Sequence, residues 1–331
     1  MGKLPDQELQ KILSCIKEDS RVVIPPMIGY DSGVHEVDGK YMVVASDPCT
    51  GVPEEWFGYL LINYAASDVA LSGAKPQFCT INLLGPRSTK PEVFQKIMKQ
   101  TCQAAVELDI AIVRGHTGMY DSLQGLVGVA TVYGTVNLEK LITPANAKPG
   151  DLILCTKPLG LETVINFALI QKELARDLFG AEVQEKFSGM VRMQSCVSEA
   201  LQLAKTGGVH AMHDATEGGV VAALNELAEA SGVGFRVDWE KLAFSREVLS
   251  LQNHFRLSDE QVLSMSSTGT VLVAVDFQAT KKVMETLRQN GLTAYFIGEF
   301  TEKERVMVKH KEEMPFPEVP IDPYNLIVSE K

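Results

Sequence analysis

The chain has 331 residues, of which 45% are hydrophobic and 22% are charged, so it is long enough for two domains and has the composition of a folded globular protein. Its 31 basic and 42 acidic residues give a formal net charge of −11, which argues against a nucleic-acid partner. No run approaches the roughly 18 apolar residues that span a membrane, and residues 1–10 lack the apolar core of a signal peptide. We therefore expect a cytoplasmic protein with no membrane partner.

The first half of the sequence alternates helical and extended patterns. Apolar residues at helical spacing predict a helix near residues 9–16, before the break at Pro25 and Pro26. A β-branched run at residues 41–46 predicts a strand that ends at Asp47. The remaining patterns predict helices over 56–72 and 91–108, and strands over 77–83, 110–113 and 126–136.

The second half repeats this mixture after a segment with two prolines and a glycine. We place the domain boundary in that segment, which gives domains 1–147 and 148–331. The fold class is therefore α/β in both halves. The predicted strands cover 151–155, 233–237, 270–275 and 295–298, and the predicted helices cover 163–174, 191–204, 219–230 and 280–288.

Three acidic positions in the first half are candidates for a metal–phosphate site. Asp31 follows Gly29 in a glycine-rich stretch that allows close approach to an anion, although a plain turn explains it equally simply. Asp47, at the end of a predicted strand, is either a natural magnesium ligand or a residue that caps a turn. Asp68 falls inside an apolar helical run, where an unpaired carboxylate is costly, so its position favours a function.

A polar turn is predicted where the strand near residues 110–113 ends. Gly115 and Thr117 flank His116 in this turn. A histidine there suits a general base near neutral pH, and a structural hydrogen bond is the alternative.

The sequence HDATEGGV at residues 213–220 precedes an apolar helix. Asp214 or Thr216 can cap that helix, and the pair Gly218 and Gly219 would leave its first amides open to a phosphate. A flexible start of a helix is the alternative interpretation.

Taken in chain order, these segments resemble the superfamily that contains aminoimidazole ribonucleotide synthetase, thiamine monophosphate kinase, selenophosphate synthetase and HypE, and the pattern is most similar to HypE. The resemblance extends over nearly the whole chain. The matching segments are 29–31, 45–47, 67–74, 112–117, 149–154, 213–219 and 267–275.

The resemblance implies a PurM-like fold, with an N-terminal mixed sheet that dimerises and a C-terminal α/β domain. It implies ATP and Mg²⁺ as cofactors, and phosphoryl transfer to an amide, carbamoyl or phosphate oxygen on a small-molecule or peptide-borne substrate. It also implies a homodimer and a maturation partner protein. The implied metal ligands are Asp31, Asp47 and Asp68, the implied catalytic residues are Asp47, His116 and Asp214, and the implied nucleotide-binding residues are Gly29, Asp31, Asp47, Asp68, Gly115, Thr117, Thr216, Gly218 and Gly219.

Some positions depart from the family pattern. Tyr30, His116 and Glu217 each change the charge expected there. HypE proteins end in a tail whose cysteine carries the carbamoyl group, whereas the last cysteine here is Cys196. We therefore expect a HypE-like scaffold without a carrier cysteine. The alternatives are an enzyme like thiamine monophosphate kinase or the purine synthetase, and a non-catalytic nucleotide-binding assembly factor.

Overall fold

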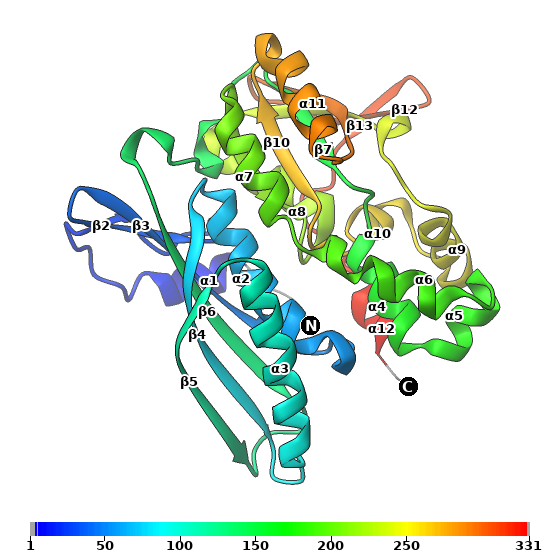
Figure 1. Ribbon diagram of the computed structural model, residues 1–331. Helices are drawn as coiled ribbons and strands as arrows, with labels where there is room; N and C mark the ends of the chain where they lie inside the picture. The colour runs from blue at the N-terminus through cyan, green and yellow to red at the C-terminus, as the bar shows by residue number, and fades with distance from the viewer. Residues whose placement is uncertain (1–3, 5, 330–331) are drawn as a thin grey trace. The chain divides into compact units, whose positions relative to one another are not determined.

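The computed structural model describes Leu4 and residues 6–329, which form two compact units (Figure 1). We call residues 18–26 and 31–141 the N-terminal unit. The C-terminal unit comprises Ile142–Lys331 together with two short segments from the start of the chain, Met1–Lys17 and Met27–Tyr30. Gly29 and Tyr30 thus belong to the C-terminal unit, whereas Asp31 belongs to the N-terminal unit.

The N-terminal unit is a six-stranded sheet with order β1-β2-β3-β6-β4-β5, covered on one face by helices α2 and α3 (Figure 1). Only the β4–β5 pair is parallel. Burial alternates along β6 because only one of its faces packs against the helices. The bounds are β1 Val22–Ile24, β2 Gly33–Val37, β3 Lys40–Cys49, β4 Lys75–Pro86, β5 Ala111–Tyr120, β6 Val127–Val136, α2 Phe57–Leu71 and α3 Pro91–Glu107.

Two strands of this sheet are longer than predicted, which corrects the surroundings of two candidate residues. β3 continues to Cys49, so Asp47 lies within the strand, opposite Ala130. Pro48 is tolerated because β2 pairs with β3 only as far as Val44, which leaves that end of β3 without a neighbour on one side.

The polar turn predicted at residues 115–118 does not exist, because β5 runs through it to Tyr120. The glycine at position 115 serves close strand packing instead. A Cβ atom on Gly115 would lie 2.8 Å from the carbonyl oxygen of Ile81 on β4.

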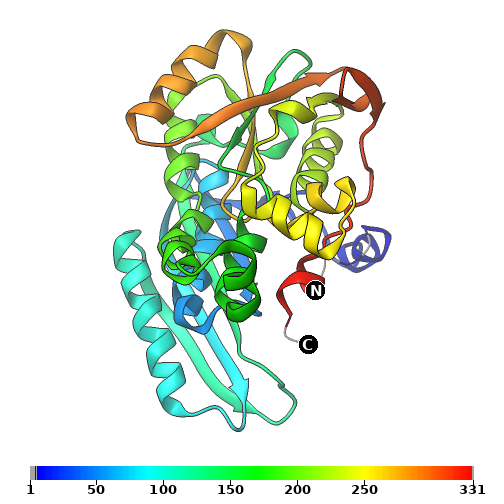
Figure 2. The same cartoon turned by 90° about the vertical axis from the view of Figure 1, so that its right-hand side faces the viewer.

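The C-terminal unit is a seven-stranded mixed sheet with order β13-β12-β9-β11-β7-β10-β8. Helix α8 packs on one face, and α7 and α11 lie on the other (Figure 2). Helices α4, α5, α6, α9 and α12 contact one another in a helical group. The strand bounds are β7 Leu152–Thr156, β8 Val209–Asp214, β9 Gly234–Asp238, β10 Val271–Val275, β11 Ala294–Thr301, β12 Arg305–Lys309 and β13 Glu312–Pro315. The helix bounds are α1 Asp6–Leu13, α4 Leu161–Ile170, α5 Lys172–Phe179, α6 Val183–Met190, α7 Val197–Thr206, α8 Gly219–Ser231, α9 Arg246–Phe255, α10 Asp259–Leu263, α11 Thr280–Gln289 and α12 Tyr324–Val328.

Strand β8 was missed by the sequence patterns, and two predicted helices are interrupted. The sequence of β8, VHAMHD, has three polar residues in six and no run of β-branched residues. The helix predicted over 163–174 splits at Gln171 into α4 and α5, and the one predicted over 191–204 begins as α7 only at Val197. Within the part of the chain that the structure describes, no helix has the length and apolar content needed to cross a membrane.

Candidate functional site

The junction between β8 and α8 brings the predicted HDATEGGV segment into a tight loop of the C-terminal unit. Gly218 and Gly219 both adopt left-handed backbone conformations, with φ angles of 83° and 56°. A Cβ atom on Gly219 would lie 2.5 Å from the carbonyl oxygen of Met265 and 2.6 Å from that of Leu263. The glycine pair is therefore required by conformation and by close packing.

His213 at the end of β8 is buried between two oxygen acceptors. Its Nδ1 atom lies 2.8 Å from the carbonyl oxygen of Asp214, and its Nε2 atom lies 2.7 Å from a carboxylate oxygen of Glu226 on α8. Oxygen atoms thus face both ring nitrogens. The Asp214 carboxylate, also buried, lies 3.9 Å from His213 Nδ1. This arrangement places the buried imidazole of His213 beside the candidate catalytic carboxylate.

Gly29 packs against the same helix. Its φ angle is +76°, and a Cβ atom on it would lie 3.3 Å from the Cβ atom of Glu226. Within the C-terminal unit, Gly29 and His213 therefore meet the same glutamate of α8.

The start of α8 is not capped as predicted. The cap is Gly218, not Asp214 or Thr216, and its N–H donates a 3.0 Å hydrogen bond to Asp322 Oδ2. The N–H of Gly219 donates to the carbonyl oxygen of Thr216. The N–H groups of the glycine pair are thus already bonded, the first to a carboxylate from the segment before α12 and the second within the loop. Binding of a phosphate by the first amides of α8 stays a prediction.

Asp322 holds the loop of the candidate site in place, and the sequence patterns do not indicate it. Besides Gly218, it accepts a 2.6 Å hydrogen bond from Ser266 Oγ and a 2.9 Å bond from the N–H of Tyr324. Asp322 lies 104 residues after Gly218 in the sequence, so no local pattern connects it with the start of α8.

A row of buried polar side chains on α4 lies in the same unit and was also missed. Thr268 Oγ1 donates to the Glu162 carboxylate, and Asn166 Nδ2 donates to the hydroxyl of Tyr324 at 2.8 Å. Gln194 Nε2 donates to Asn166 Oδ1 at 3.2 Å. Glu162 and Asn166 are one helical turn apart in an otherwise apolar helix, and that spacing is the signal that could have revealed them.

In the N-terminal unit, Asp47 and Asp68 both face the interface between α2 and the sheet. Asp47 lies two residues from the buried residues Ala45 and Cys49 along β3, so the three side chains share one face of the strand. Asp68 is 7% exposed, and helical spacing places it on the same side of α2 as Leu61, which packs against Gly128 of β6. Asp31, Asp47 and Asp68 offer only hard oxygen donors, the ligands that Mg²⁺ prefers. Their carboxylates do not gather within 4.8 Å of one another in the described residues.

His116 is exposed on edge strand β5, and its Nε2 atom lies 3.0 Å from the hydroxyl of Tyr120. Gly115 and Thr117 are exposed on the same strand. Tyr30 is one of the positions that depart from the family pattern. Burial raises the pKa of its hydroxyl, so Tyr30 carries no charge at neutral pH.

Two family models match the chain. The N-terminal domain of AIR synthase related protein matches residues 29–136, and its C-terminal domain matches residues 148–311. The chain belongs to the AIR synthase related protein family. Relatives of the chain include proteins named selenide, water dikinase and carbamoyl dehydratase HypE.

Curated relatives of the family match most of the chain. A putative hydrogenase expression/formation protein of Methanocaldococcus jannaschii is 28% identical over 284 residues, covering 84% of this chain and 81% of the relative. Selenide, water dikinase of Aeromonas hydrophila is 29% identical, covering 86% and 83%. Carbamoyl dehydratase HypE of Cupriavidus necator is 27% identical, covering 82% and 76%.

Solved structures confirm the predicted PurM-like fold. A chain of a HypE–HypF complex aligns with a TM-score of 0.75 and 21% identity, covering 93% of this chain and 98% of that one. A HypE structure in complex with ATP aligns with a TM-score of 0.71 and 17% identity, covering 95% and 91%.

The tight packing of the β8–α8 loop leads to a stability prediction. Gly219→Ala forces a Cβ atom against two carbonyl oxygens in a left-handed conformation, and we expect it to lower the free energy of unfolding by about 2–4 kcal/mol in urea titrations. Gly232→Ala at the other end of α8 is the matched control. Gly232 is also left-handed, but nothing lies within 4 Å of its Cβ position, so the expected loss is about 1 kcal/mol. Equal losses would show that packing at Gly219 is unimportant.

Proposed function

We propose that this protein is an ATP-dependent enzyme that phosphorylates and then dehydrates a carbamoyl or amide group, as its HypE relatives do. The observation that carries the proposal is the match to carbamoyl dehydratase HypE and to the hydrogenase expression/formation protein across both family domains. The buried pair of Asp214 and His213 at the β8–α8 junction supports it.

The proposed reaction removes one oxygen and two protons from the carbamoyl group. The γ-phosphoryl group of ATP moves to the carbamoyl oxygen, ADP leaves, and the phosphorylated oxygen then departs as phosphate while the nitrogen loses its protons and becomes a nitrile. Bound Mg²⁺ would neutralise charge on the triphosphate. We assign its ligands to Asp31, Asp47 and Asp68, and the base that accepts the nitrogen's protons to Asp214. The buried imidazole of His213, 3.9 Å from that carboxylate, packs beside it and limits its movement.

Titration calorimetry with ATP and Mg²⁺ tests this proposal. Because Asp47→Asn and Asp68→Asn each remove a proposed metal ligand, we expect either to weaken nucleotide binding roughly tenfold and the double variant to bind still more weakly. Asp121→Asn is the control, because this exposed carboxylate of the same unit has no proposed ligand role. Failure of the wild-type protein to bind ATP would overturn the proposal.

The substrate is tested by mass spectrometry with an S-carbamoyl thiol peptide. Conversion to the thiocyanate, with loss of one water and release of one phosphate per ATP consumed, would support dehydration. The selenide, water dikinase relative of similar identity provides a second candidate. Phosphate release with hydrogen selenide and none with the peptide would favour that activity instead.

The two thiols of the C-terminal half are inaccessible, so we propose neither as a carrier of the carbamoyl group. Cys155 and Cys196, its two cysteines, are both fully buried. Burial also raises the pKa of the Cys155 thiol to about 12.

Alkylation of the native protein tests this inaccessibility. At pH 8 we expect iodoacetamide to modify Cys15 and Cys102, which are exposed, and to spare Cys79 and Cys155. Burial disfavours their thiolates and raises the pKa of Cys79 to about 11, so their reactive fraction is small until the pH approaches these values. All six cysteines should react after unfolding in urea. Rapid modification of Cys155 in the native protein would contradict the prediction.

We also propose a homodimer formed through edge strand β5. All ten residues of β5 are at least partly exposed, including Ile112, Val113 and Met119, and Phe78 on neighbouring β4 is 40% exposed. A long apolar edge strand of this kind is an aggregation hazard unless another strand or sheet covers it. If a second copy of the protein packs against this surface through its own β5, the β5 strands of both copies are covered.

Light scattering of charged variants tests the dimer. Val113→Lys places a charge in the proposed interface, so we expect the dimer to dissociate to monomers at micromolar concentration. Val106→Lys on α3 is the control, because Val106 is even more exposed and lies outside the interface. A dimer that survives Val113→Lys would place the interface elsewhere.

A maturation partner protein is the remaining part of the proposal. It is supported by the HypE–HypF complex among the structural neighbours.

A further inference from the structure

The sheet of the C-terminal unit is covered unevenly on the face opposite α8. Every residue of β10 is buried, and four of the five residues of β7 are buried. In contrast, side chains from β9, β11 and β12 remain partly or fully exposed on alternate positions. Part of this face is therefore a free surface of the unit.

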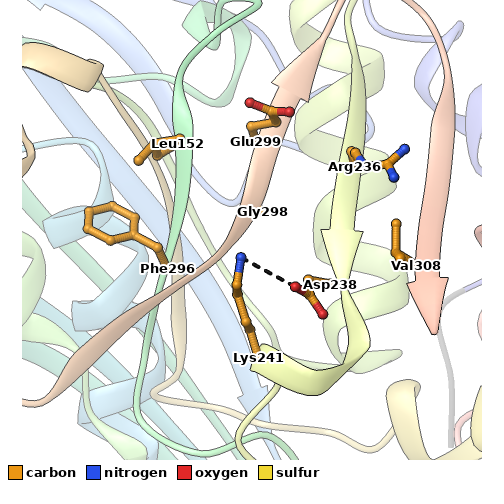
Figure 3. Close-up of a pocket in the computed structure, with 8 residues that line it drawn as sticks. All are labelled: Leu152, Arg236, Asp238, Lys241, Phe296, Gly298, Glu299 and Val308. Carbon is orange, nitrogen blue, oxygen red and sulfur yellow. Dashed lines mark ion pairs between the residues drawn. The ribbon is translucent and has the colours of Figure 1, made fainter. Parts of the chain in front are cut away.

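A hollow of about 350 Å³ lies on this open part (Figure 3). Its centre is Gly298, at an irregularity in the pairing between β11 and β7. A Cβ atom on Gly298 would lie 2.0 Å from the carbonyl oxygen of Arg236, so only glycine fits and no side chain rises above it. The residues around it are Leu152, Arg236, Asp238, Lys241, Phe296, Glu299 and Val308.

The charges of the hollow leave one carboxylate uncompensated. Arg236 forms an ion pair with Glu313, and Lys241 lies 3.3 Å from Asp238 (Figure 3). The carboxylate of Glu299 forms no ion pair or hydrogen bond with the residues that the structure describes. Both cations are therefore neutralised locally, and Glu299 is left as the negative charge at the rim.

The apolar part of the hollow complements this charge. Phe296 and Leu152 lie on one side, and Val308 lies across from them (Figure 3). A ligand that fills the space thus needs an apolar stem and a cationic end. Lysine and arginine side chains have this construction, and an aromatic ring also attracts their cationic groups.

The openness of the site indicates a side chain of another protein rather than a free metabolite. The side chains of Arg236 and Lys241 are 43% and 59% exposed at the rim. A free small ligand in such a shallow site would remain largely in water, whereas small-molecule pockets enclose most of their ligand. A second hollow, along α11, shares Phe296 and is lined also by Met284, Leu292, Lys281 and the ion pair between Arg288 and Glu285. The footprint is therefore larger than one side chain.

We propose that this face is a protein-docking surface, in which the hollow over Gly298 receives a lysine or arginine side chain from a basic, partly apolar segment of a partner. The net charge of −11 favours approach of such a partner. The proposal uses none of the residues of the proposed catalytic site and does not depend on its activity.

Methyl NMR of the full-length protein tests the proposal with defined probes. The first probe is the acetylated, amidated peptide Ala-Leu-Arg-Leu-Ala, and its matched control carries neutral citrulline in place of arginine. We expect the arginine peptide to shift the methyl signals of Leu152 and Val308 and to bind more tightly than the citrulline peptide. The difference should shrink as salt is raised. Absence of shifts at millimolar peptide, or equal binding of the two peptides, would overturn the proposal.

Glu299→Gln provides the second arm. Removing the rim carboxylate should weaken binding of the arginine peptide by roughly two- to fivefold, the range of an exposed ion pair, and leave the citrulline peptide unaffected. Glu173→Gln on α5 is the control, because Glu173 is an exposed carboxylate outside the hollow. Stronger binding of a peptide with glutamate at the central position would show that Arg236 and Lys241 make this an anion site, and would also overturn the proposal.

Discussion

Close backbone packing at the start of α8 is the constraint on which the C-terminal unit depends. With Gly219 pressed against the carbonyl oxygens of residues 263 and 265, the loop after β8 has one available path. That path fixes His213 beside Glu226 and turns the N–H of Gly218 toward Asp322. Further bonds from Ala215 to Thr270 and from residue 267 back to Ala215 hold the loop to the neighbouring segment. Because these contacts share one loop, the geometry around Asp214 follows from the glycine pair.

The α/β class and the central strands and helices of the N-terminal unit could be predicted from the sequence, since periodicity and β-branched runs report local burial. Short strands such as β8 carry no such pattern and were missed. The glycine pair and Asp214 could be singled out as candidates, because the glycine-rich pattern is local. The ends of strands were less certain: Asp47 and His116 seemed to lie in loops, yet β3 and β5 run past them. Pro48 and the glycines near position 116 looked like breaks, and only the pairing with neighbouring strands shows that they are not.

Long-range polar contacts could not be read from spacing at all. Asp322 meets Gly218 across 104 residues, and Thr268 meets Glu162 across 106. Such pairs depend on the whole fold, whereas motif analysis examines a few neighbouring positions. The substituted charges illustrate the same limit. His116 lies on an exposed strand, whereas His213 is buried beside Asp214.

The hydrogen bonds of Asp322 have a thermodynamic consequence for the end of the chain. The same carboxylate accepts hydrogen bonds from the N–H of Gly218, the cap at the start of α8, and from the N–H of Tyr324, the first residue of α12. The stabilities of the two helices are therefore linked. Loosening of α12 leaves the N–H of Gly218 without its acceptor, and a group that competes for this N–H loosens α12. Local opening of these two segments, far apart in sequence, should behave as one cooperative unit.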